Sequence, residues 1–511
     1  MNKLDVLFIS PGNAASIYQN LYEIYSAIEP PTWALLLAES CRSVGYSVDL
    51  IDINAEQISN DIVIERIQRL NPRLICFVVY GQNVNAGTVN MSGAVYTSNY
   101  IKASGITTPI AFVGSHVQAL PIKCLEDEPS IDIGFTNEGV YALRNLLSTN
   151  INLDKLDDIR GIVWRKNGKV VLNVAEKIVP NSRMDIDLPG YAWDLLPYKE
   201  TPLDLYRSPM WHAEYKFENR SPYAAIQTSL GCQFACEFCM INILNRNDED
   251  EIGVAGNYST MRHWSPEFII KQFDKLAEMG VYTIKITDEM FLLNKKYYVP
   301  LCELLSTRQY ASKLRMWAYS RIDTVRNPET LKLIRNAGIR WLALGIESAE
   351  KTIRLEVSKG RFEDVDIHKV IQQIHDADIE VMANYIFGLP GDTMESMRKT
   401  LELSKELCTL GWNAYAAMAL PGSQLYKGAI SKGIELPKTY EAYSFHGYET
   451  LPLPTDTLSA AEILKFRDDA YVEYHSHEPF LAKLKNKFGQ FASDNITEML
   501  KVKLNRKLLK H

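Results

Sequence analysis

The sequence predicts an α/β protein: an N-terminal flavodoxin-like, doubly wound parallel sheet, then a partial (β/α)6 barrel, then a small, mostly helical C-terminal segment. Two observations predict this fold class. The first 150 residues alternate five nearly continuous apolar strands with helices, which is the pattern of an open parallel sheet. From residue 224 onward a strand–helix unit recurs about six times, too few for a closed eight-stranded barrel.

Length and composition indicate several domains of ordinary globular character. A chain of 511 residues is too long for one core, and its longest apolar runs are far shorter than a membrane helix requires. With a net charge of −7, we expect no nucleic-acid partner. Eight cysteines in so long a chain do not indicate a disulfide framework, and the N-terminus lacks signal-peptide features. We therefore expect a cytoplasmic protein in a reducing, anaerobic setting.

The first domain, residues 1–150, contains the elements of the open sheet. Its predicted strands are 6–10, 46–53, 73–81, 109–115 and 131–137, and its predicted helices are 33–45, 61–70, 94–104 and 138–147. Ligands of such sheets bind beyond the carboxyl ends of the strands. We call the residues at these ends the first-domain rim: Ser10, Pro11, Gly12, Tyr80, Gly81, Gln82, Asn83, Gly114, Ser115, His116, Glu138 and Gly139.

Residues 151–220 are predicted to form a linker that contains a β-hairpin over 161–173. An Asn-Gly pair, Asn167-Gly168, marks its two-residue turn. The barrel is expected over 221–440, and residues 441–511 are expected to form a helical cap. This last segment either covers the mouth of the barrel or packs as plain core, and its histidines are not predicted to be ligands.

The barrel pattern consists of strands followed by helices with clear start signals. Ser265 and Pro266 open a helix over 265–280 as N-cap and first residue. The predicted strands are 224–231, 282–291, 315–323, 341–348, 381–391 and 413–422, and the other predicted helices are 295–306 and 328–338. In parallel βα barrels the chemistry lies at the carboxyl ends of the strands.

Three cysteines follow the first barrel strand at C-x3-C-x2-C spacing: Cys232, Cys236 and Cys239. Thiolates on one tight loop select an iron–sulfur cluster, zinc or cuprous copper. A structural zinc site needs four ligands, and the loop contains no fourth Cys or His. Reduced buried cysteines, or a zinc site completed from elsewhere in the chain, are the alternatives. Three thiolates on a four-iron cluster would leave one iron open to bind another group.

With Gly231 before the first cysteine and Phe238 before the third, the loop resembles the cluster motif of the radical S-adenosylmethionine (SAM) superfamily. The resemblance implies a [4Fe–4S] cluster whose open iron chelates SAM. It also implies an external electron donor of flavodoxin or ferredoxin type, whose electron releases a 5′-deoxyadenosyl radical. Residues at the barrel strand ends that match the family's SAM-binding positions are Phe238, Asp288, Glu289, Ser320, Arg321, Glu347, Asn384, Tyr385 and Leu420.

Upstream of such a barrel, the first domain looks like the cobalamin-binding domain of the cobalamin-dependent radical SAM family. The stretch VGSH over 113–116 resembles the family's VGG-x-H, and the resemblance implies that the first-domain rim binds cobalamin. The D-x-H-x-x-G motif of other cobalamin domains is missing, since Asp52-Ile53-Asn54 contains no His. We therefore expect cobalt without a His ligand, and a backbone hydrogen bond for His116. A degenerated ligand site is the alternative.

The resemblance implies a C-methyltransferase that moves a methyl group from methylcobalamin to an unactivated carbon after hydrogen abstraction. The alternatives are a cyclase or ring-rearranging enzyme with the same cofactors, an RNA methylthiotransferase, and a non-enzymatic corrinoid or redox sensor. The substrate, a small molecule or a peptide, is not identified by the sequence, because the matched motifs bind cofactors.

Overall fold

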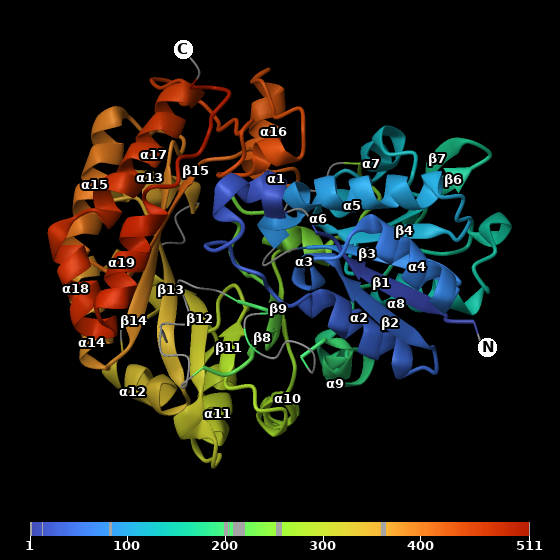
Figure 1. Ribbon diagram of the computed structural model, residues 1–511, viewed down its shortest axis with the longest axis horizontal. Coiled ribbons are helices and arrows are strands. Elements are labelled where there is room, and N and C mark those ends of the chain that lie inside the picture. The colour runs from blue at the N-terminus through green and yellow to red at the C-terminus, as the bar shows by residue number, and fades with distance from the viewer. Residues whose placement is uncertain are drawn as a thin grey trace.

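The computed structural model describes residues 3–12, 14–80, 84–198, 203, 205–207, 220–251, 258–325, 327–358 and 364–509. Two α/β units lie side by side, and the C-terminal helices pack on the barrel unit (Figure 1). Three residues predicted in the first-domain rim, Gly81, Gln82 and Asn83, lie outside the described residues.

The first sheet has the strand order β2-β1-β3-β4-β5-β6-β7. The first five strands are parallel, in the 2-1-3-4-5 order of a flavodoxin-like fold, which confirms the predicted class. The predicted hairpin forms β6 and β7, with Asn167 and Gly168 at positive φ in its turn, and it adds two antiparallel strands to this sheet. The strands are β1 (Val6–Ser10), β2 (Val48–Asp52), β3 (Leu74–Val79), β4 (Ile110–Gly114), β5 (Ile133–Phe135), β6 (Ile162–Lys166) and β7 (Lys169–Leu172).

Helices cover both faces of this sheet because its strands are apolar on both sides. Successive residues of β1, such as Phe8 and Ile9, belong to two different apolar clusters, one on each face. Helices α2 and α8 contribute to one cluster, and α4 and α5 to the other. The helices are α1 (Ala14–Tyr18), α2 (Thr32–Arg42), α3 (Ile53–Glu56), α4 (Asn60–Leu70), α5 (Gly87–Ala103), α6 (Ser115–Ala119), α7 (Pro121–Asp127) and α8 (Val140–Ser148).

The second sheet is an all-parallel half-barrel with the strand order β15-β14-β13-β12-β11-β8. Six strands in this order confirm the predicted partial barrel. The strands are β8 (Tyr223–Ile226), β11 (Thr283–Ile286), β12 (Arg315–Arg321), β13 (Ile339–Glu347), β14 (Glu380–Phe387) and β15 (Gly411–Ala416). The helices of this unit are α10 (Pro266–Glu278), α11 (Lys295–Ser306), α12 (Pro328–Asn336), α13 (Lys351–Val357), α14 (Ile367–Asp376) and α15 (Met394–Leu407).

The predicted first barrel strand, 224–231, is two strands. β8 ends at Ile226, and β9 (Ser229–Gly231) leaves the barrel to pair antiparallel with β10 (Met261–His263). Between them the Thr228 backbone N–H and hydroxyl donate to the Asp288 carboxylate at 2.6 Å, which turns the chain toward the cysteine loop. Gly231 has a φ of 83° and touches the Thr260 carbonyl so closely that a Cβ would collide with it.

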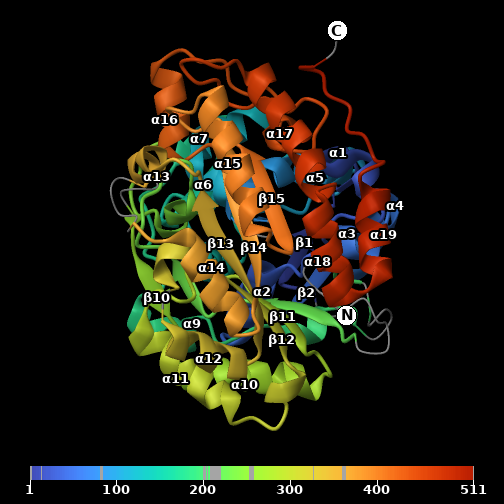
Figure 2. The ribbon, with the colours of Figure 1, turned by 90° about the vertical axis from the view of Figure 1, so that its left-hand side faces the viewer.

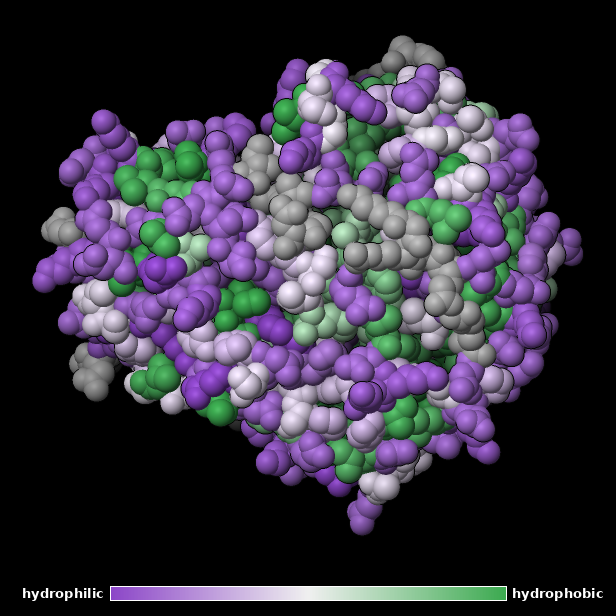
Figure 3. Space-filling view, turned by 180° about the vertical axis from the view of Figure 1, so that it is seen from behind, coloured by the Kyte–Doolittle hydropathy of each residue, from purple (hydrophilic) through white to green (hydrophobic). Residues whose placement is uncertain are grey.

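Beyond the barrel the chain is helical, as predicted. It forms α16 (Gln424–Ser431), α17 (Ala460–His475), α18 (Glu478–Phe488) and α19 (Gln490–Met499). Trp412 of β15 stacks on Tyr474 of α17 with ring centroids 5.0 Å apart, and Figure 2 shows α17 crossing beside this edge strand. None of the helices in the described part of the chain is long and apolar enough to cross a bilayer. The rear face in Figure 3 is mainly hydrophilic, with apolar residues in separate patches.

Candidate active site

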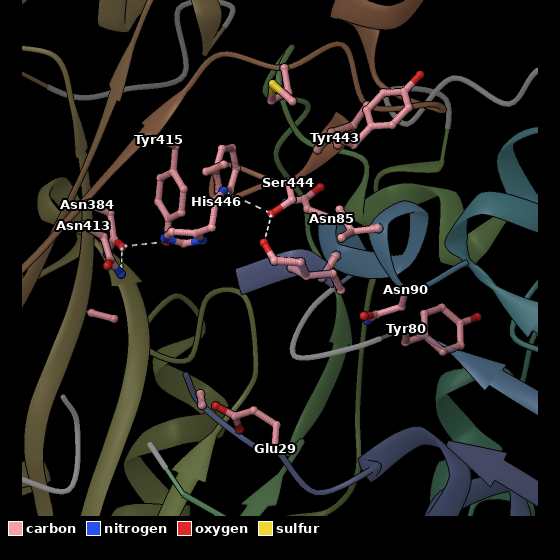
Figure 4. A pocket seen from close by; sticks show the side chains of 18 of the residues that line it. Glu29, Tyr80, Asn85, Asn90, Asn384, Asn413, Tyr415, Tyr443, Ser444 and His446 are labelled. Atoms are coloured by element: carbon pink, nitrogen blue, oxygen red, sulfur yellow. Dashed lines mark hydrogen bonds between the residues drawn. The ribbon is translucent and has the colours of Figure 1, made fainter. Parts of the chain in front are cut away.

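A cavity of about 580 Å³ lies between the two units, at the carboxyl ends of the strands of both sheets. Ser10 and Tyr80 line it from the first domain, and the three predicted cluster cysteines line it from the barrel. The C-terminal segment 443–446 and helix α17 close a further side. Figure 4 shows Tyr80 and Asn90 of the first domain on one side of this space, and Asn384 and Asn413 of the barrel on another.

The cysteine loop is held in a form that presents its sulfur atoms to the cavity. The backbone N–H groups of Phe234 and Ile241 donate to the Sγ atoms of Cys232 and Cys239, each at 3.4 Å. Asn85, from the short 3₁₀ helix Val84–Ala86 of the first domain, lies with Nδ2 3.8 Å from Cys239 Sγ. Hydrogen bonds to ligand sulfurs are one of the levers by which proteins tune iron–sulfur clusters.

Cys232 is buried, and Cys236 and Cys239 are partly exposed toward the cavity. Burial raises the pKa of Cys232 to about 12 and that of Cys236 to about 11. Such thiols become thiolates when a metal centre binds, because the metal's positive charge replaces the proton. In the described residues no group of three or more His, Cys, Asp or Glu side chains converges as for a single metal ion. Three soft sulfur donors without a fourth ligand fit a cluster with one open iron.

Two carboxyl groups, Glu289 and Glu347, face the same cavity. Burial raises the pKa of each to about 7. Glu347 lies at a break in the β13–β14 register and has a φ of 67°, a conformation that non-glycine residues rarely adopt. Strain of this kind is typical of functional positions, where it aims a side chain that an ordinary strand would turn away.

Arg321 also lines the cavity, and its charge acts on both Glu347 and Cys236. Its guanidinium makes two 2.6 Å hydrogen bonds to the Asp323 carboxylate and lies 3.9 Å from the centre of the Phe234 ring. Four other residues predicted from the resemblance also line the cavity: Phe238, Ser320, Asn384 and Leu420.

Two predicted SAM-binding residues do not reach the cavity. The carboxylate of Asp288 is buried and accepts hydrogen bonds from Thr228 and from the Ser229 hydroxyl, so it shapes the turn before the cysteine loop. Tyr385 is fully buried and packs near Trp412, with ring centroids 6.2 Å apart. Because successive strand residues point to opposite faces, Asn384 faces the cavity and Tyr385 does not.

Ser10, Pro11 and Tyr80 of the first-domain rim line the cavity, whereas its other described residues do not. Gly12 lies close against Ile53, Gly114 lies against the Val79 carbonyl with no space for a Cβ, and Gly139 is the N-cap of α8 with a φ of 82°. The Ser115 hydroxyl donates to the Val84 carbonyl at 2.6 Å. A contact of these residues with cobalamin stays a prediction.

His116 and Glu138 have protein partners of their own. His116 lies in helix α6 rather than in a loop, and its Nδ1 is 3.2 Å from the Thr88 hydroxyl, not from a backbone group as expected. Burial lowers the pKa of His116 to about 4, so the ring is neutral. Glu138 Oε2 accepts a hydrogen bond at 2.7 Å from Arg262 of β10, and Oε1 accepts one from the Val179 N–H at 2.5 Å. Glu138 therefore joins the two units.

Several cavity residues were not predicted from the sequence. They lie in α1, in the loop before α2, in α5, at the end of β15 and in the C-terminal segment, and include Tyr18, Glu29, Asn90, Asn413, Tyr415, His446 and Arg467. None of these segments carries a motif with fixed spacing, so only the tertiary fold brings them together. Among these residues, Glu29 forms a buried ion pair of 2.9 Å with Lys285 inside the barrel.

Comparison with protein-family models decides the class of protein. The model of the radical SAM superfamily matches residues 226–404, and the model of the B12-binding domain matches residues 25–147. The chain belongs to the cobalamin-dependent radical SAM family. The resemblance drawn from the cysteine loop and the upstream sheet is thereby confirmed.

The chain is also similar to individual proteins, distantly in sequence but over most of its length. An uncharacterized methyltransferase of Pyrococcus horikoshii is 23% identical over 488 residues, 94% of this chain and 95% of that protein. The anaerobic magnesium-protoporphyrin IX monomethyl ester cyclase of Cereibacter sphaeroides is 23% identical over 390 residues, 73% of this chain and 56% of the cyclase. The structure of the cobalamin-dependent SAM radical enzyme OxsB with aqua-cobalamin and SAM bound gives a TM-score of 0.67 at 15% identity, covering 98% of this chain and 71% of that chain.

As a cobalamin-dependent radical SAM enzyme, the protein uses a [4Fe–4S] cluster, SAM and cobalamin. The donor groups around the cavity fit this set. Three sulfur atoms suit the cluster, and carboxyl groups beside a guanidinium suit the amino and carboxylate groups of SAM. The open strand ends of the first sheet face the same space, which suits cobalamin.

Proposed function

We propose that this cobalamin-dependent radical SAM enzyme is a methyltransferase that places a methyl group on an unactivated carbon. One observation carries the proposal: the three cysteines of the barrel and the described rim residues Ser10 and Tyr80 line one continuous cavity. A substrate in that cavity is accessible from both cofactor sites without leaving the protein. The 94% coverage of this chain by a methyltransferase relative supports the same reaction class.

The bound cofactors supply the difficult chemistry: SAM at the cluster provides for removal of a hydrogen atom from the substrate, and cobalamin carries the methyl group. Cys232, Cys236 and Cys239 would hold the cluster. Glu289 and Glu347 would attract the amino group of SAM, and Arg321 would lie beside its carboxylate. Burial disfavours the charged form of both carboxyl groups and so raises their pKa values. A bound cation would stabilise the carboxylates in place of the proton.

The protein's remaining task is to hold the substrate and exclude water. Helix α17 and the segment 443–446 cover the cavity on the barrel's open edge, beside β15. Arg506 fixes this cover, because its guanidinium donates to the carbonyl groups of Phe445 and Gly447 at 2.7 and 2.9 Å. An external electron donor of flavodoxin or ferredoxin type and a small-molecule or peptide substrate complete the proposal. None of the eight cysteines, all of which lie within the described residues, forms a disulfide, which is in keeping with the reducing cytoplasm that we propose for this protein.

Ring formation without methyl transfer is the second candidate. It is favoured by the similarity to a magnesium-protoporphyrin IX monomethyl ester cyclase, which extends over 73% of this chain. Cyclases and methyltransferases can share both cofactor sites, since fold alone does not fix the reaction.

The mass of the product separates the two candidates. The protein is purified without oxygen, reconstituted with iron, sulfide and hydroxocobalamin, and incubated with methyl-deuterated SAM, a reductant and a small-molecule extract of the producing cells. We expect a new product that has gained one labelled methyl group, together with 5′-deoxyadenosine. A product that has lost hydrogen and gained no label would support cyclisation and contradict methyl transfer.

A further inference from the structure

One side of the cavity consists of residues that belong to no cofactor motif. We call Tyr18, Tyr415, Phe445, His446, Arg467 and Tyr471 the recognition wall; all of them line the cavity. They come from α1, the end of β15, the C-terminal segment and α17. Tyr415 and His446 point into the same space in Figure 4, with Asn384 and Asn413 close by.

Four rings of the wall lie in contact as two pairs. The Tyr415 and Phe445 centroids are 4.9 Å apart, and those of Tyr18 and His446 are 5.2 Å apart. Hydrogen bonds fix the segments that carry them: the Ser444 hydroxyl donates to the Ile17 carbonyl at 3.2 Å, and Gln19 Nε2 donates to the His446 carbonyl at 2.6 Å. Such a set of fixed aromatic faces binds a flat ring by stacking, at little cost in side-chain entropy.

Arg467 adds one positive charge to this wall. Its side chain is 7% exposed, Nε donates to the Ala414 carbonyl at 3.0 Å, and Nη1 donates to Asp468 at 3.1 Å. Asp468 also accepts two 2.8 Å hydrogen bonds from Arg506, so two guanidinium groups share one carboxylate. Within the described residues, Nη2 of Arg467 has no hydrogen-bond partner. A buried cation that is only half compensated attracts an anion.

The polar groups next to Arg467 do not carry a second positive charge. Asn384 is satisfied by the protein, because its Nδ2 donates to the Leu344 and Met382 carbonyls, and its Oδ1 accepts from Asn413 and from the Tyr415 hydroxyl. His446 is neutral, because burial, helped by Arg467 and Arg506, lowers its pKa well below the ordinary value. Arg467 is therefore the charged group that this wall presents.

We infer that the recognition wall selects a flat aromatic substrate that carries a carboxylate, with the ring against Tyr18, Tyr415 and Phe445 and the carboxylate on Arg467. The inference rests on the proposed function only in taking the cavity as the substrate site. It assigns Arg467 and the aromatic residues to substrate recognition, and leaves the transferred group open.

Binding of three small probes to the reconstituted full-length protein tests the inference. 1-Pyrenebutyrate has an aromatic ring and a carboxylate, 1-pyrenebutyramide lacks the charge, and decanoate lacks the ring. Anaerobic calorimetry with SAM present should show pyrenebutyrate binding at least tenfold more tightly than either of the others, since a charge-assisted hydrogen bond and ring stacking each contribute. Arg467→Gln should remove the preference for the acid over the amide and leave the amide's affinity within twofold, whereas Arg467→Lys should keep part of the preference.

Arg398→Gln is the matched control, because Arg398 lies on α15, outside the cavity lining, and pairs with Glu473. It should bind all three probes like the wild type. Equal binding of acid and amide by the wild type, a preference that survives in Arg467→Gln, binding abolished by SAM, or no binding of pyrenebutyrate would each overturn the inference. Should Arg467→Gln fail to fold, Tyr415→Leu carries the test, and it should weaken acid and amide by the same factor. SAM cleavage and bound cobalamin, measured in the same samples, report on the proposed function separately.

Discussion

Individual side chains at the strand ends set the chemistry of this protein. The cysteines lie on a loop that begins at Gly231, and Glu347 is turned into the cavity by a positive φ at a break in the strand register. The cysteine loop and the Glu347 side chain both depend on local backbone geometry, because a regular strand would not place these groups as the loop and the register break do.

Replacing Cys236 by Ala tests the cluster assignment at this scale. Two thiolates cannot hold a four-iron cluster as three can, so 5′-deoxyadenosine formation should fall at least 100-fold. Cys408→Ala is the matched control, since Cys408 is a free thiol remote from the cavity lining. It should retain full SAM cleavage after reconstitution. Cleavage by Cys236→Ala at the wild-type rate would remove the basis of the assignment.

The raised pKa of Glu347 predicts how the free energy of unfolding depends on pH. Because burial raises it from 4.5 to about 7, the folded chain keeps a proton here that the unfolded chain has already released. Stability of the cofactor-free protein therefore falls as pH rises from about 4.5 to 7, by about 3 kcal/mol from this group. Glu347→Gln should lose less stability than the wild type between pH 5 and pH 8 in urea unfolding. An identical loss in both proteins would show that the carboxyl is not perturbed.

Among the elements, the strands and most helices could be predicted from the sequence, because apolar runs, N-caps and an Asn-Gly turn are local signals. Helix α11 begins and ends where predicted, and the hairpin turn lies at Asn167-Gly168. The break in the first barrel strand could not be predicted, since it depends on Asp288, some 60 residues further along the chain. For the same reason the motifs located the cofactor side of the site, whereas the recognition wall appears only in the tertiary structure.

Glu138, whose contact with cobalamin stays a prediction, also has a structural role. It forms a buried ion pair with Arg262, with side chains 0% and 5% exposed. Glu138→Gln would leave the Arg262 guanidinium without its counter-ion, so the free energy of unfolding should fall by about 3 kcal/mol in the cofactor-free protein. Urea denaturation measures this.

The exposed pair of Lys123 and Asp127 on α7 provides the control for that prediction. Asp127→Asn should change the free energy of unfolding by less than about 0.5 kcal/mol, since surface ion pairs contribute little. If Glu138→Gln instead left unfolding unchanged and weakened cobalamin binding, the original prediction for Glu138 would hold.

At the scale of the whole molecule, the carboxyl ends of the strands in one α/β unit face those in the other across the cavity. Residues from both units, the Glu138–Arg262 and Glu29–Lys285 pairs among them, fix this arrangement. Asn85 of the first domain even approaches the sulfur of Cys239. The arrangement matters because two cofactors can act on one substrate only if both open into the same space.

Magnetic interaction between the cofactors tests this central claim most directly. The protein is reconstituted with iron, sulfide and cobalamin. The electron paramagnetic resonance signal of cobalamin in its Co(II) state is then recorded before and after the cluster is reduced. The account predicts that cluster reduction broadens or splits the cobalamin signal, and that this change is missing in Cys236→Ala. Cluster and cobalamin signals that simply add, with no change in either, would mean that the two cofactors do not share the cavity.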